Sequence, residues 1–373
     1  MTDYQCAMCE VRSPVEALTW RCPQCRGPWD LDFAAGPVPR NSLSGRLNSL
    51  WRYEEALPLA AADASRGSQA VSLGEGRTPL VPLTETVTAK LDFLMPTLSF
   101  KDRGAVMLAE LARHLKPRRV IADSSGNAGT SIAAYCARAG LDCTVYVPAA
   151  TPQKKAEQIS AHGARLDIVP GGREEAALAA RAAADEDGVF YASHVYNPYF
   201  LHGTKTYVYE IWEDLGGRLP ETLVVPAGNG TLLLGAYLAI EELHSHGLIA
   251  ERPALIAVQA SAVAPLAFAF RAGADDILVP AATTPTLAEG IAIPNPPRAR
   301  QILTAVRGTG GTVLTVTEDQ IRTAQLDLAG RGLFVEPTGV ACWAAIGAHG
   351  LDDRTTVVPL CGAGAKTGLA PRD

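Results

Sequence analysis

Four cysteines near the N-terminus have the spacing of metal ligands. Cys6 and Cys9 form a C-x2-C pair, and Cys22 and Cys25 repeat it after twelve intervening residues. Four thiolates complete a tetrahedral Zn²⁺ site that leaves no position for a substrate. We therefore predict a structural zinc site in a ribbon of residues 1–35. A module this short buries too little apolar surface to fold alone, so the metal would supply its folding free energy.

A lysine with potential chemistry lies at the start of a predicted helix. Ser99 and Asp102 have the S-x-x-D spacing of a capping box, which places Lys101 in the first helical turn. The positive end of the helix dipole and desolvation both favour the neutral amine there. A neutral amine can form a Schiff base with an aldehyde cofactor. Because most first-turn lysines are simply solvated, this assignment depends on the neighbouring motifs.

Two glycine-rich loops could bind anions. Gly228-Asn229-Gly230-Thr231 follows an apolar run, and its backbone N–H groups and hydroxyl suit a phosphate. Residues 124–129, Ser-Ser-Gly-Asn-Ala-Gly, form a second such loop suited to a substrate carboxylate, with the Asn127 amide able to meet a phenolic oxygen. Neither loop fits GxGxxG or the P-loop pattern, which argues against nucleotide binding.

The elements that must position these residues alternate between strand and helix. Short apolar runs, each followed by a turn and most leading into an Ala- and Leu-rich helical stretch, occupy residues 120–122, 143–147, 166–169, 223–225, 254–258 and 356–360. This pattern predicts an α/β fold with parallel sheets covered on both faces, and ligands at the carboxyl ends of the strands. The uncharged stretch 223–240 is long enough for a membrane span, but Pro226 and Gly228 interrupt it. We predict a buried strand, a loop and a buried helix instead.

Composition narrows the class of protein. The chain has 373 residues, 47% hydrophobic and 19% charged, enough for two domains and a small module and too apolar for a disordered chain. Its net charge of −6 argues against a nucleic-acid partner. The first residues lack the pattern of a signal peptide, so we expect a cytoplasmic protein with no membrane partner. Three further cysteines, Cys136, Cys143 and Cys342, are expected to be small buried hydrophobic residues.

At this point the motifs resemble a known family over nearly the whole chain. The matching segments, in order, are the double C-x2-C, 51–53, 74–80, 99–104, 124–129, 197–198 with 203–206, 226–230, 334–337 and the terminal glycine turn. They are similar to fold-type II pyridoxal-phosphate (PLP) enzymes, above all the threonine synthases with a zinc ribbon. The resemblance implies two three-layer αβα domains, with Lys101 as the PLP lysine and Asn127 at its O3′. It also implies that Gly228, Asn229, Gly230, Thr231 and Leu232 hold the phosphate and that Cys361 faces the pyridine nitrogen.

The family reaction would convert O-phospho-L-homoserine and water to L-threonine and phosphate. Expected ligands for the carboxylate or phosphate of this amino-acid substrate are Ser124, Ser125, Thr130, Arg165, Asn197 and Lys205, with capping and surface charge as the alternative roles. We predict a ribbon at 1–35, a linker and N-terminal segment at 36–60, a large PLP-binding domain at 61–117 and 201–373, and a small inserted substrate domain at 118–200. We also expect a homo-oligomer, a dimer.

Several departures keep two alternatives open. Phe200 stands where threonine synthases commonly have arginine, and His202, where they have glutamate, is expected to be a packing or surface residue. Cys361 resembles the cysteine of serine dehydratases, and a thiol would not keep the pyridine nitrogen protonated. Elimination or β-replacement on another amino acid is therefore the first alternative. The second is a binding or regulatory protein with a degenerate PLP domain, against which the intact 99–101 motif and the mixed charges of the ribbon both argue.

Overall fold

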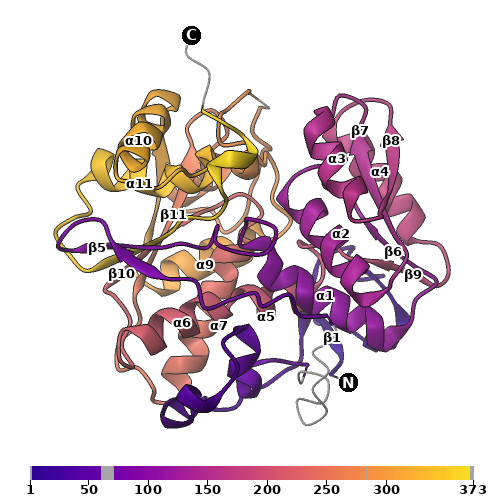
Figure 1. The fold of residues 1–373 in the computed structure, drawn as a ribbon, viewed down its shortest axis with the longest axis horizontal. Helices are drawn as coiled ribbons and strands as arrows, with labels where there is room; N and C mark the ends of the chain where they lie inside the picture. The colour runs from indigo at the N-terminus through magenta and orange to yellow at the C-terminus, as the bar shows by residue number, and fades with distance from the viewer. Residues whose placement is uncertain (1, 60–70, 283, 370–373) are drawn as a thin grey trace. The chain divides into compact units, whose positions relative to one another are not determined.

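The computed structural model describes residues 2–59, 71–282 and 284–369 and divides into two compact units (Figure 1). Unit 1 comprises Met1–Glu75 and Lys101–Thr204, and unit 2 comprises Gly76–Phe100 and Lys205–Asp373. No helix in the described part of the chain is long and apolar enough to cross a bilayer.

The central sheet of unit 1 is entirely parallel. Its strands β6 (Arg119–Ala122), β7 (Cys143–Pro148), β8 (Arg165–Val169) and β9 (Val189–Tyr191) lie in the order β8-β7-β6-β9. Side chains alternate between the two faces as strand geometry requires. Val120 and Ala122 join one buried cluster, whereas Ile121 between them joins another. The carboxyl ends of the four strands meet at one edge, where the loops that begin at residues 123, 149, 170 and 192 emerge.

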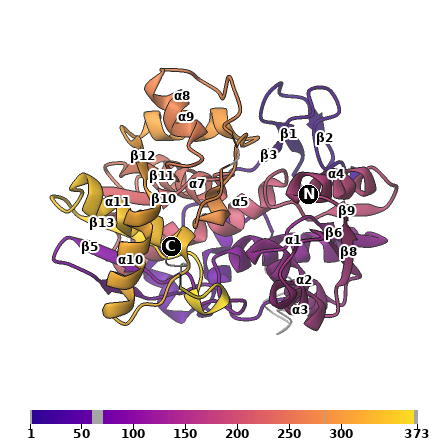
Figure 2. The same cartoon turned by 90° about the horizontal axis from the view of Figure 1, so that it is seen from above.

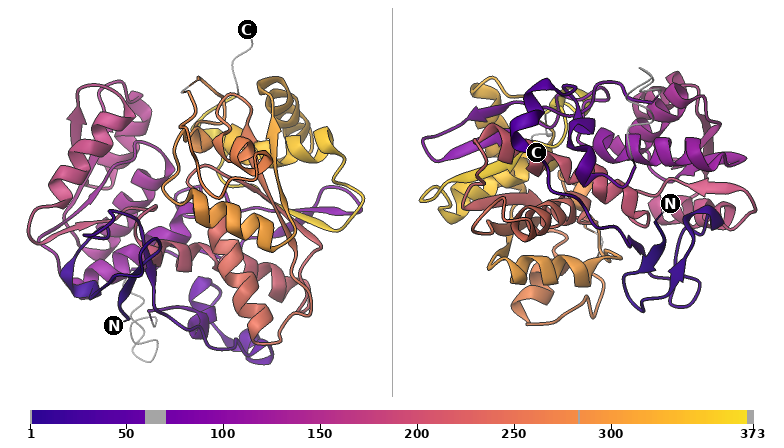
Figure 3. Two further views of the ribbon diagram at one scale, coloured as in Figure 1. Left: turned by 180° about the vertical axis from the view of Figure 1, so that it is seen from behind. Right: turned by 90° about the horizontal axis from the view of Figure 1, so that it is seen from below.

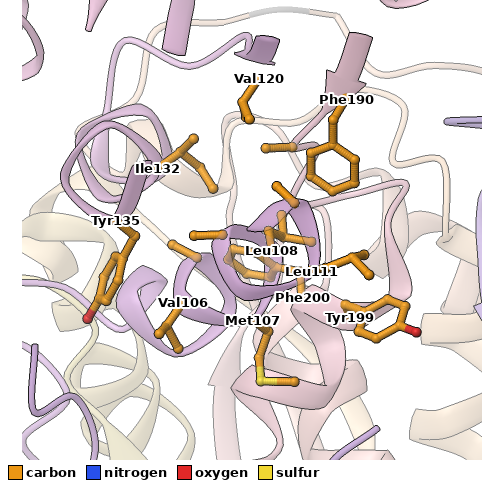
Figure 4. Close-up of a cluster of buried hydrophobic side chains, with 14 of the residues drawn as sticks. Val106, Met107, Leu108, Leu111, Val120, Ile132, Tyr135, Phe190, Tyr199 and Phe200 are labelled. Carbon is orange, nitrogen blue, oxygen red and sulfur yellow. The ribbon is translucent and has the colours of Figure 1, made fainter. Parts of the chain in front are cut away.

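Helices cover both faces of this sheet. Helices α1 (Lys101–Leu115), α2 (Asn127–Ala139) and α3 (Gln153–Ala161) pack together on one side, α4 (Arg173–Ala184) crosses the other, and α5 (Pro198–Thr204) packs on α1. Figure 4 shows Phe200 of α5 among the α1 side chains. Two glycines permit this approach: a Cβ at Gly104 would lie 2.4 Å from the Phe200 ring, and one at Gly203 would lie 2.0 Å from the Arg103 carbonyl.

The N-terminal module is a small antiparallel sheet that belongs to unit 1. Strands β1 (Tyr4–Cys6), β2 (Arg12–Ser13) and β3 (Trp29–Leu31) lie in the order β2-β1-β3, and Figure 2 shows this sheet. A 3-10 turn at Val15–Ala17 follows β2, and the described part of the predicted linker contains two more, Arg40–Gly45 and Leu50–Ala56. Tyr4, Cys22 and Trp29 are buried in the same apolar cluster as α1 and α2. The module therefore packs on the body of unit 1.

Unit 2 holds a six-stranded sheet. Strands β4 (Leu80–Pro82), β5 (Val87–Lys90), β10 (Thr222–Pro226), β11 (Ala254–Ala260), β12 (Thr312–Val316) and β13 (Thr356–Pro359) lie in the order β12-β11-β10-β13-β5-β4. All neighbours are parallel except β4 and β5. Because β13 is the neighbour of both β10 and β5, the loops that follow these three strands emerge at one edge.

Helices again form the outer layers of unit 2, as Figure 3 shows from behind and below. Helix α11 (Pro337–His349) packs on the sheet, and α10 (Glu318–Gly330) packs on α11. Helices α7 (Thr231–Ser245) and α9 (Ala299–Gly308) also pack on the sheet, and α6 (Thr206–Asp214) packs on α7. Helix α8 (Pro265–Arg271) contacts β12, and short 3-10 turns lie at Glu289–Ile291 and Gly364–Lys366. The predicted α/β class is thus confirmed. The stretch 223–240 is, as predicted, a buried strand, a loop and a helix.

The predicted capping box at the start of α1 is wrong. The Ser99 hydroxyl is fully buried and has no hydrogen-bond partner among the described residues, and the Asp102 carboxylate accepts a hydrogen bond from Ser131 of α2. The reason is that α1 begins at Lys101, which makes Phe100 the N-cap residue, while Ser99 lies one residue earlier and bridges to Gly362.

Candidate functional site

The four predicted metal ligands converge. Their sulfur atoms all lie within 4.8 Å of one another, with Cys6 to Cys25 at 3.3 Å and Cys9 to Cys22 at 3.6 Å. Tetrahedral Zn–S bonds of about 2.3 Å separate the sulfurs by about 3.8 Å, so the cluster has the right size. The backbone N–H groups of Met8 and Gly27 point at the sulfurs of Cys6 and Cys25. Such donors stabilise thiolate charge, and the donor set suits a closed, structural Zn²⁺ site.

Lys101 is the first residue of α1, and its surroundings in unit 1 are aromatic and cationic. Its Nζ atom lies 5.6 Å from the centroid of the Phe200 ring. The His194 ring packs edge-on against the same ring at 5.8 Å. The pKa of His194 lies well below its ordinary value because the ring is buried and because Lys101 and Arg173 carry positive charge nearby. His194 is therefore neutral at physiological pH.

The loop that follows β6 presents polar side chains at the start of α2. Ser124, Ser125 and Asn127 are all half-buried, and the Ser124 hydroxyl accepts a hydrogen bond from the Gly126 N–H at 3.2 Å. The loop is held tightly against α2, because a Cβ at Gly129 would lie 1.7 Å from the Ser124 carbonyl oxygen. The helix begins at Asn127, so its first N–H groups face this loop. Thr130 is buried in the same first turn, where its N–H donates to the Gly126 carbonyl.

A half-buried carboxyl group, that of Asp123, lies immediately before this loop. Burial raises the pKa of Asp123, and a hydrogen bond from Tyr191 together with the charges of Arg173 and Arg181 lowers it again in part. Asp123 and Tyr191 lie at the ends of neighbouring parallel strands, so this hydrogen bond ties the β6 loop to the segment that follows β9. No local pattern in the sequence indicates this pair, since their proximity depends on the pairing of β6 with β9.

The loop that follows β10 in unit 2 offers backbone rather than side chains. In the described structure, the N–H groups of Gly228, Asn229 and Gly230 donate to no protein acceptor. Gly230 has φ +75, and a Cβ at Gly228 would lie 2.8 Å from the Ile291 Cα atom. Only glycine fits both positions. The loop then opens directly onto α7, whose positive dipole end adds to the attraction for an anion.

Cys361 and Ser99 lie beside each other at the same edge of the unit 2 sheet. Cys361 follows β13, and its carbonyl accepts a hydrogen bond from the Phe100 N–H at 2.9 Å. Ser99 bridges to Gly362. The Cys361 thiol is fully buried, and its Sγ atom lies 3.4 Å from the Pro359 carbonyl oxygen, to which an S–H group can donate.

The structure places three predicted substrate ligands away from these loops or in other contacts. Arg165 is exposed at the amino end of β8, at the opposite edge of the sheet from Ser124. The Asn197 amide donates to the Tyr4 hydroxyl at 3.1 Å and accepts from the Tyr199 N–H. The Lys205 ammonium is fully buried and pairs with Glu242 at 2.6 Å. These contacts compete with binding of a substrate anion.

Sequence reasoning missed His194 and the role of the 74–80 segment. His194 follows β9 at the carboxyl edge, which is the signal that could have identified it. In the 74–80 segment, buried Glu75 accepts hydrogen bonds from Trp51 and Tyr135, each at 2.9 Å. This glutamate therefore anchors α2 and the N-terminal segment of unit 1.

Comparison with known proteins gives one family. A family model described as pyridoxal-phosphate dependent enzyme matches residues 71–362. Threonine synthase of Methanosarcina acetivorans is 30% identical over 358 residues, covering 93% of this chain and 86% of the relative. Threonine synthase of Methanocaldococcus jannaschii is 32% identical, covering 92% and 86%. Among solved structures, a threonine deaminase from T.th. is 26% identical with a TM-score of 0.65, covering 79% of this chain and 94% of that one.

Proposed function

Because this chain belongs to the pyridoxal-phosphate dependent enzyme family, we propose that it catalyses the threonine synthase reaction, in which O-phospho-L-homoserine and water give L-threonine and phosphate. The observation that carries the proposal is the match to threonine synthases at 30–32% identity over more than nine-tenths of the chain. The enzyme would act on a small amino-acid substrate in the cytoplasm, as a homodimer.

The residues of unit 2 fit the cofactor. The N–H groups of 228–230, which have no acceptor in the described part of the chain, suit a phosphate group at the start of α7, together with the hydroxyl of Thr231 and the backbone of Leu232. The buried Ser99 hydroxyl lacks a partner among the described residues, and a polar bound group would supply one. A thiol at Cys361 suits an unprotonated pyridine nitrogen. Unit 2 makes up most of the predicted large domain, residues 61–117 and 201–373, and we propose that this domain binds the cofactor.

Lys101 would hold the cofactor aldehyde and move protons. Bound PLP would supply an electron sink for negative charge at the substrate Cα. The Lys101 amine would remove protons from Cα and Cβ while phosphate leaves from Cγ, and would return protons to Cγ and Cα as the hydroxyl of water adds at Cβ. Because His194 is neutral, its ring adds no positive charge near this amine, and Asn127 would contact the cofactor O3′.

The loop after β6 would bind the substrate. Ser124, Ser125 and Thr130 would donate to its carboxylate at the start of α2, within the substrate domain of residues 118–200. Arg165, Asn197 and Lys205 remain predicted ligands, although the contacts of Asn197 and Lys205 favour structural roles and Arg165 is exposed at the opposite edge of the sheet. We further propose that Cys6, Cys9, Cys22 and Cys25 hold a structural Zn²⁺ in a ribbon of residues 1–35.

Elimination of water from serine or threonine, with release of ammonia, is the second candidate. Two observations favour it: the fully buried Phe200 lies beside Lys101 where a cation would serve a phosphate, and threonine deaminase shares the fold at 26% identity.

One pair of assays tests the proposal. The purified PLP-loaded enzyme is given O-phospho-L-homoserine with phosphate release measured, and serine and threonine with ammonia release measured. We expect phosphate release, and its loss by at least about 1,000-fold in Lys101→Ala because no other amine replaces it. Arg138→Ala serves as the matched removal of a cation in unit 1 and should retain activity within about threefold, since the side chain is exposed in the last turn of α2, at the end away from Ser124. Ammonia release without phosphate release would favour the second candidate.

A further inference from the structure

The N-terminal ribbon makes most of its aromatic contacts to one segment of unit 1, residues 191–202. Trp20 packs edge-on against Tyr191 at 5.3 Å and against Tyr196 at 5.0 Å. Phe33 packs edge-on against His202 at 5.3 Å. The Trp29 N–H donates to the Tyr196 carbonyl at 3.1 Å.

Tyr4 is the central contact. Its ring stacks on Trp29 at 5.6 Å and meets Tyr199 edge-on at 6.4 Å. Its hydroxyl accepts the Asn197 amide at 3.1 Å, and the other end of that amide accepts the Tyr199 N–H at the start of α5. Tyr4 is two residues before Cys6, in the strand that leads into the cluster of four thiols. The thiol cluster is thus connected to the start of α5 through one strand and one side-chain amide.

The same segment carries the groups beside Lys101. His194 and Phe200 lie on either side of Asn197, and their rings contact each other. Lys101 lies over the Phe200 ring, and α5 packs so closely on α1 that Gly104 admits no Cβ. A small shift of residues 194–200 would therefore change what faces the lysine amine.

We propose that Tyr4 is a positioning residue and that the metal-bound ribbon clamps residues 191–202, holding His194 and Phe200 against Lys101. This proposal rests on the proposed function only in giving Lys101 its role. Two of its contacts are side-chain hydrogen bonds and serve as the attachment points to be tested: Tyr4 on Asn197, and Trp20, whose Nε1 donates to Asp185 at 2.8 Å just after α4. The metal acts at a distance, by keeping β1 and the Trp20 loop folded.

Hydrogen exchange of the full-length, metal- and PLP-loaded protein tests this directly. Tyr4→Phe keeps the ring and its stacking but removes the acceptor for Asn197. We expect the amides of 194–202 to exchange about fivefold faster, because the free energy of local opening falls by that of one hydrogen bond. The metal content and the exchange of β10 in unit 2 should not change. The matched control is Tyr237→Phe in α7, a partly exposed tyrosine that should leave exchange at 194–202 at the wild-type rate.

Metal removal is the second arm. A chelator should raise exchange at 191–202 in the wild type by about tenfold or more, and added ZnCl₂ should reverse this, because both attachment points are lost together. In steady-state kinetics, Tyr4→Phe should raise KM for the amino-acid substrate about fivefold with kcat within about twofold, a split that a general loss of folded protein would not produce.

Two results would overturn the clamp: rapid exchange of ribbon amides 4–31 in chelator with no change at 191–202, or wild-type exchange at 194–202 in Tyr4→Phe. If Tyr4→Phe fails to retain metal, Trp20→Phe tests the other attachment point, with faster exchange at 191–196 expected and an unchanged rate contradicting the proposal. Exchange needs no turnover, so a protein that behaves as expected here but releases no phosphate would overturn the proposed function and leave the clamp standing.

Discussion

Two strand-to-helix loops in this molecule have similar positions and different chemistry. Residues 123–127 of unit 1 and 227–231 of unit 2 each follow a buried parallel strand and open onto a helix. The unit 1 loop presents serine and asparagine side chains, and its N-cap Gly126 has an extended backbone. The unit 2 loop presents bare N–H groups, and its N-cap Gly230 is left-handed.

If the two loops bind substrate and cofactor as proposed, one fold divides recognition between backbone and side chains. A nest of backbone N–H groups binds any suitably sized anion and depends on glycine for its shape. Side-chain hydroxyls are placed individually and discriminate among substrates. We therefore expect the unit 2 loop to tolerate side-chain changes but not an added Cβ. In the unit 1 loop we expect an added Cβ at Gly126 to be tolerated, and the loss of a serine side chain to weaken substrate binding.

The largest expected effect comes from adding one methyl group to each loop. Gly228→Ala places a Cβ 2.8 Å from the Ile291 Cα atom, so the backbone must shift and the nest opens. We expect PLP affinity to fall about 100-fold, the loss of one or two charge-assisted hydrogen bonds. Gly126→Ala is the matched control, since its nearest neighbour is 3.9 Å away, and should bind PLP within about twofold of wild type. Equal losses in both variants would show that the two loops do not differ in this way.

A second glycine in unit 1 tests packing rather than binding. Gly129→Ala forces a Cβ to within 1.7 Å of the Ser124 carbonyl oxygen, and backbone atoms cannot give way as a side chain can. We expect unfolding by denaturant to show a loss of about 2 kcal/mol. Stability within experimental error of wild type would mean that the β6 loop is not held against α2 as described.

Removing one side chain from each loop should give smaller differences in KM and in PLP affinity. Ser125→Ala removes one donor from the substrate loop, so KM for the amino-acid substrate should rise about tenfold with PLP affinity unchanged. Asn229→Ala leaves the backbone nest intact and should change neither quantity by more than about twofold. A larger effect from Asn229→Ala than from Ser125→Ala would reverse the assignment of side-chain and backbone recognition.

The smallest effect is a pH dependence near the unit 1 loop. The folded-state pKa of His194 lies below its unfolded value because the ring is buried and faces Lys101 and Arg173. As pH falls, the His194 ring therefore takes up its proton in the unfolded chain before it does so in the folded chain. The stability that comes from keeping this ring neutral is full above about pH 6.5 and decreases below it. Between about pH 7 and about pH 5.5, His194→Gln should lose about 1 kcal/mol less stability than wild type. Identical pH profiles would contradict this.

Much of the site was predictable because it is local in sequence. The cysteine spacing, the strand-turn-helix pattern around Gly228 and the position of Lys101 at a helix start all depend on neighbours within a few residues. Lys205 illustrates the opposite case: it is a cation within a motif, yet its partner Glu242 lies 37 residues away and occupies its ammonium. Arg165 required knowledge of which end of β8 it occupies. Ser99 fits the capping pattern, but strand-like pairing with Gly362 overrides that local preference.

The α/β alternation, the four-thiol cluster and the two glycine-rich loops after parallel strands could be predicted from the sequence alone, because hydrophobic periodicity, glycine conformation and ligand spacing are short-range properties. Three other features depend on the folded arrangement. Pairing of β6 with β9 brings Asp123 to Tyr191, packing of α5 on α1 brings Phe200 and its neighbour His194 to Lys101, and docking of β1 places Tyr4 on Asn197. These contacts join residues far apart in the chain, and they are selected by the packing of whole helices and strands rather than by any local pattern.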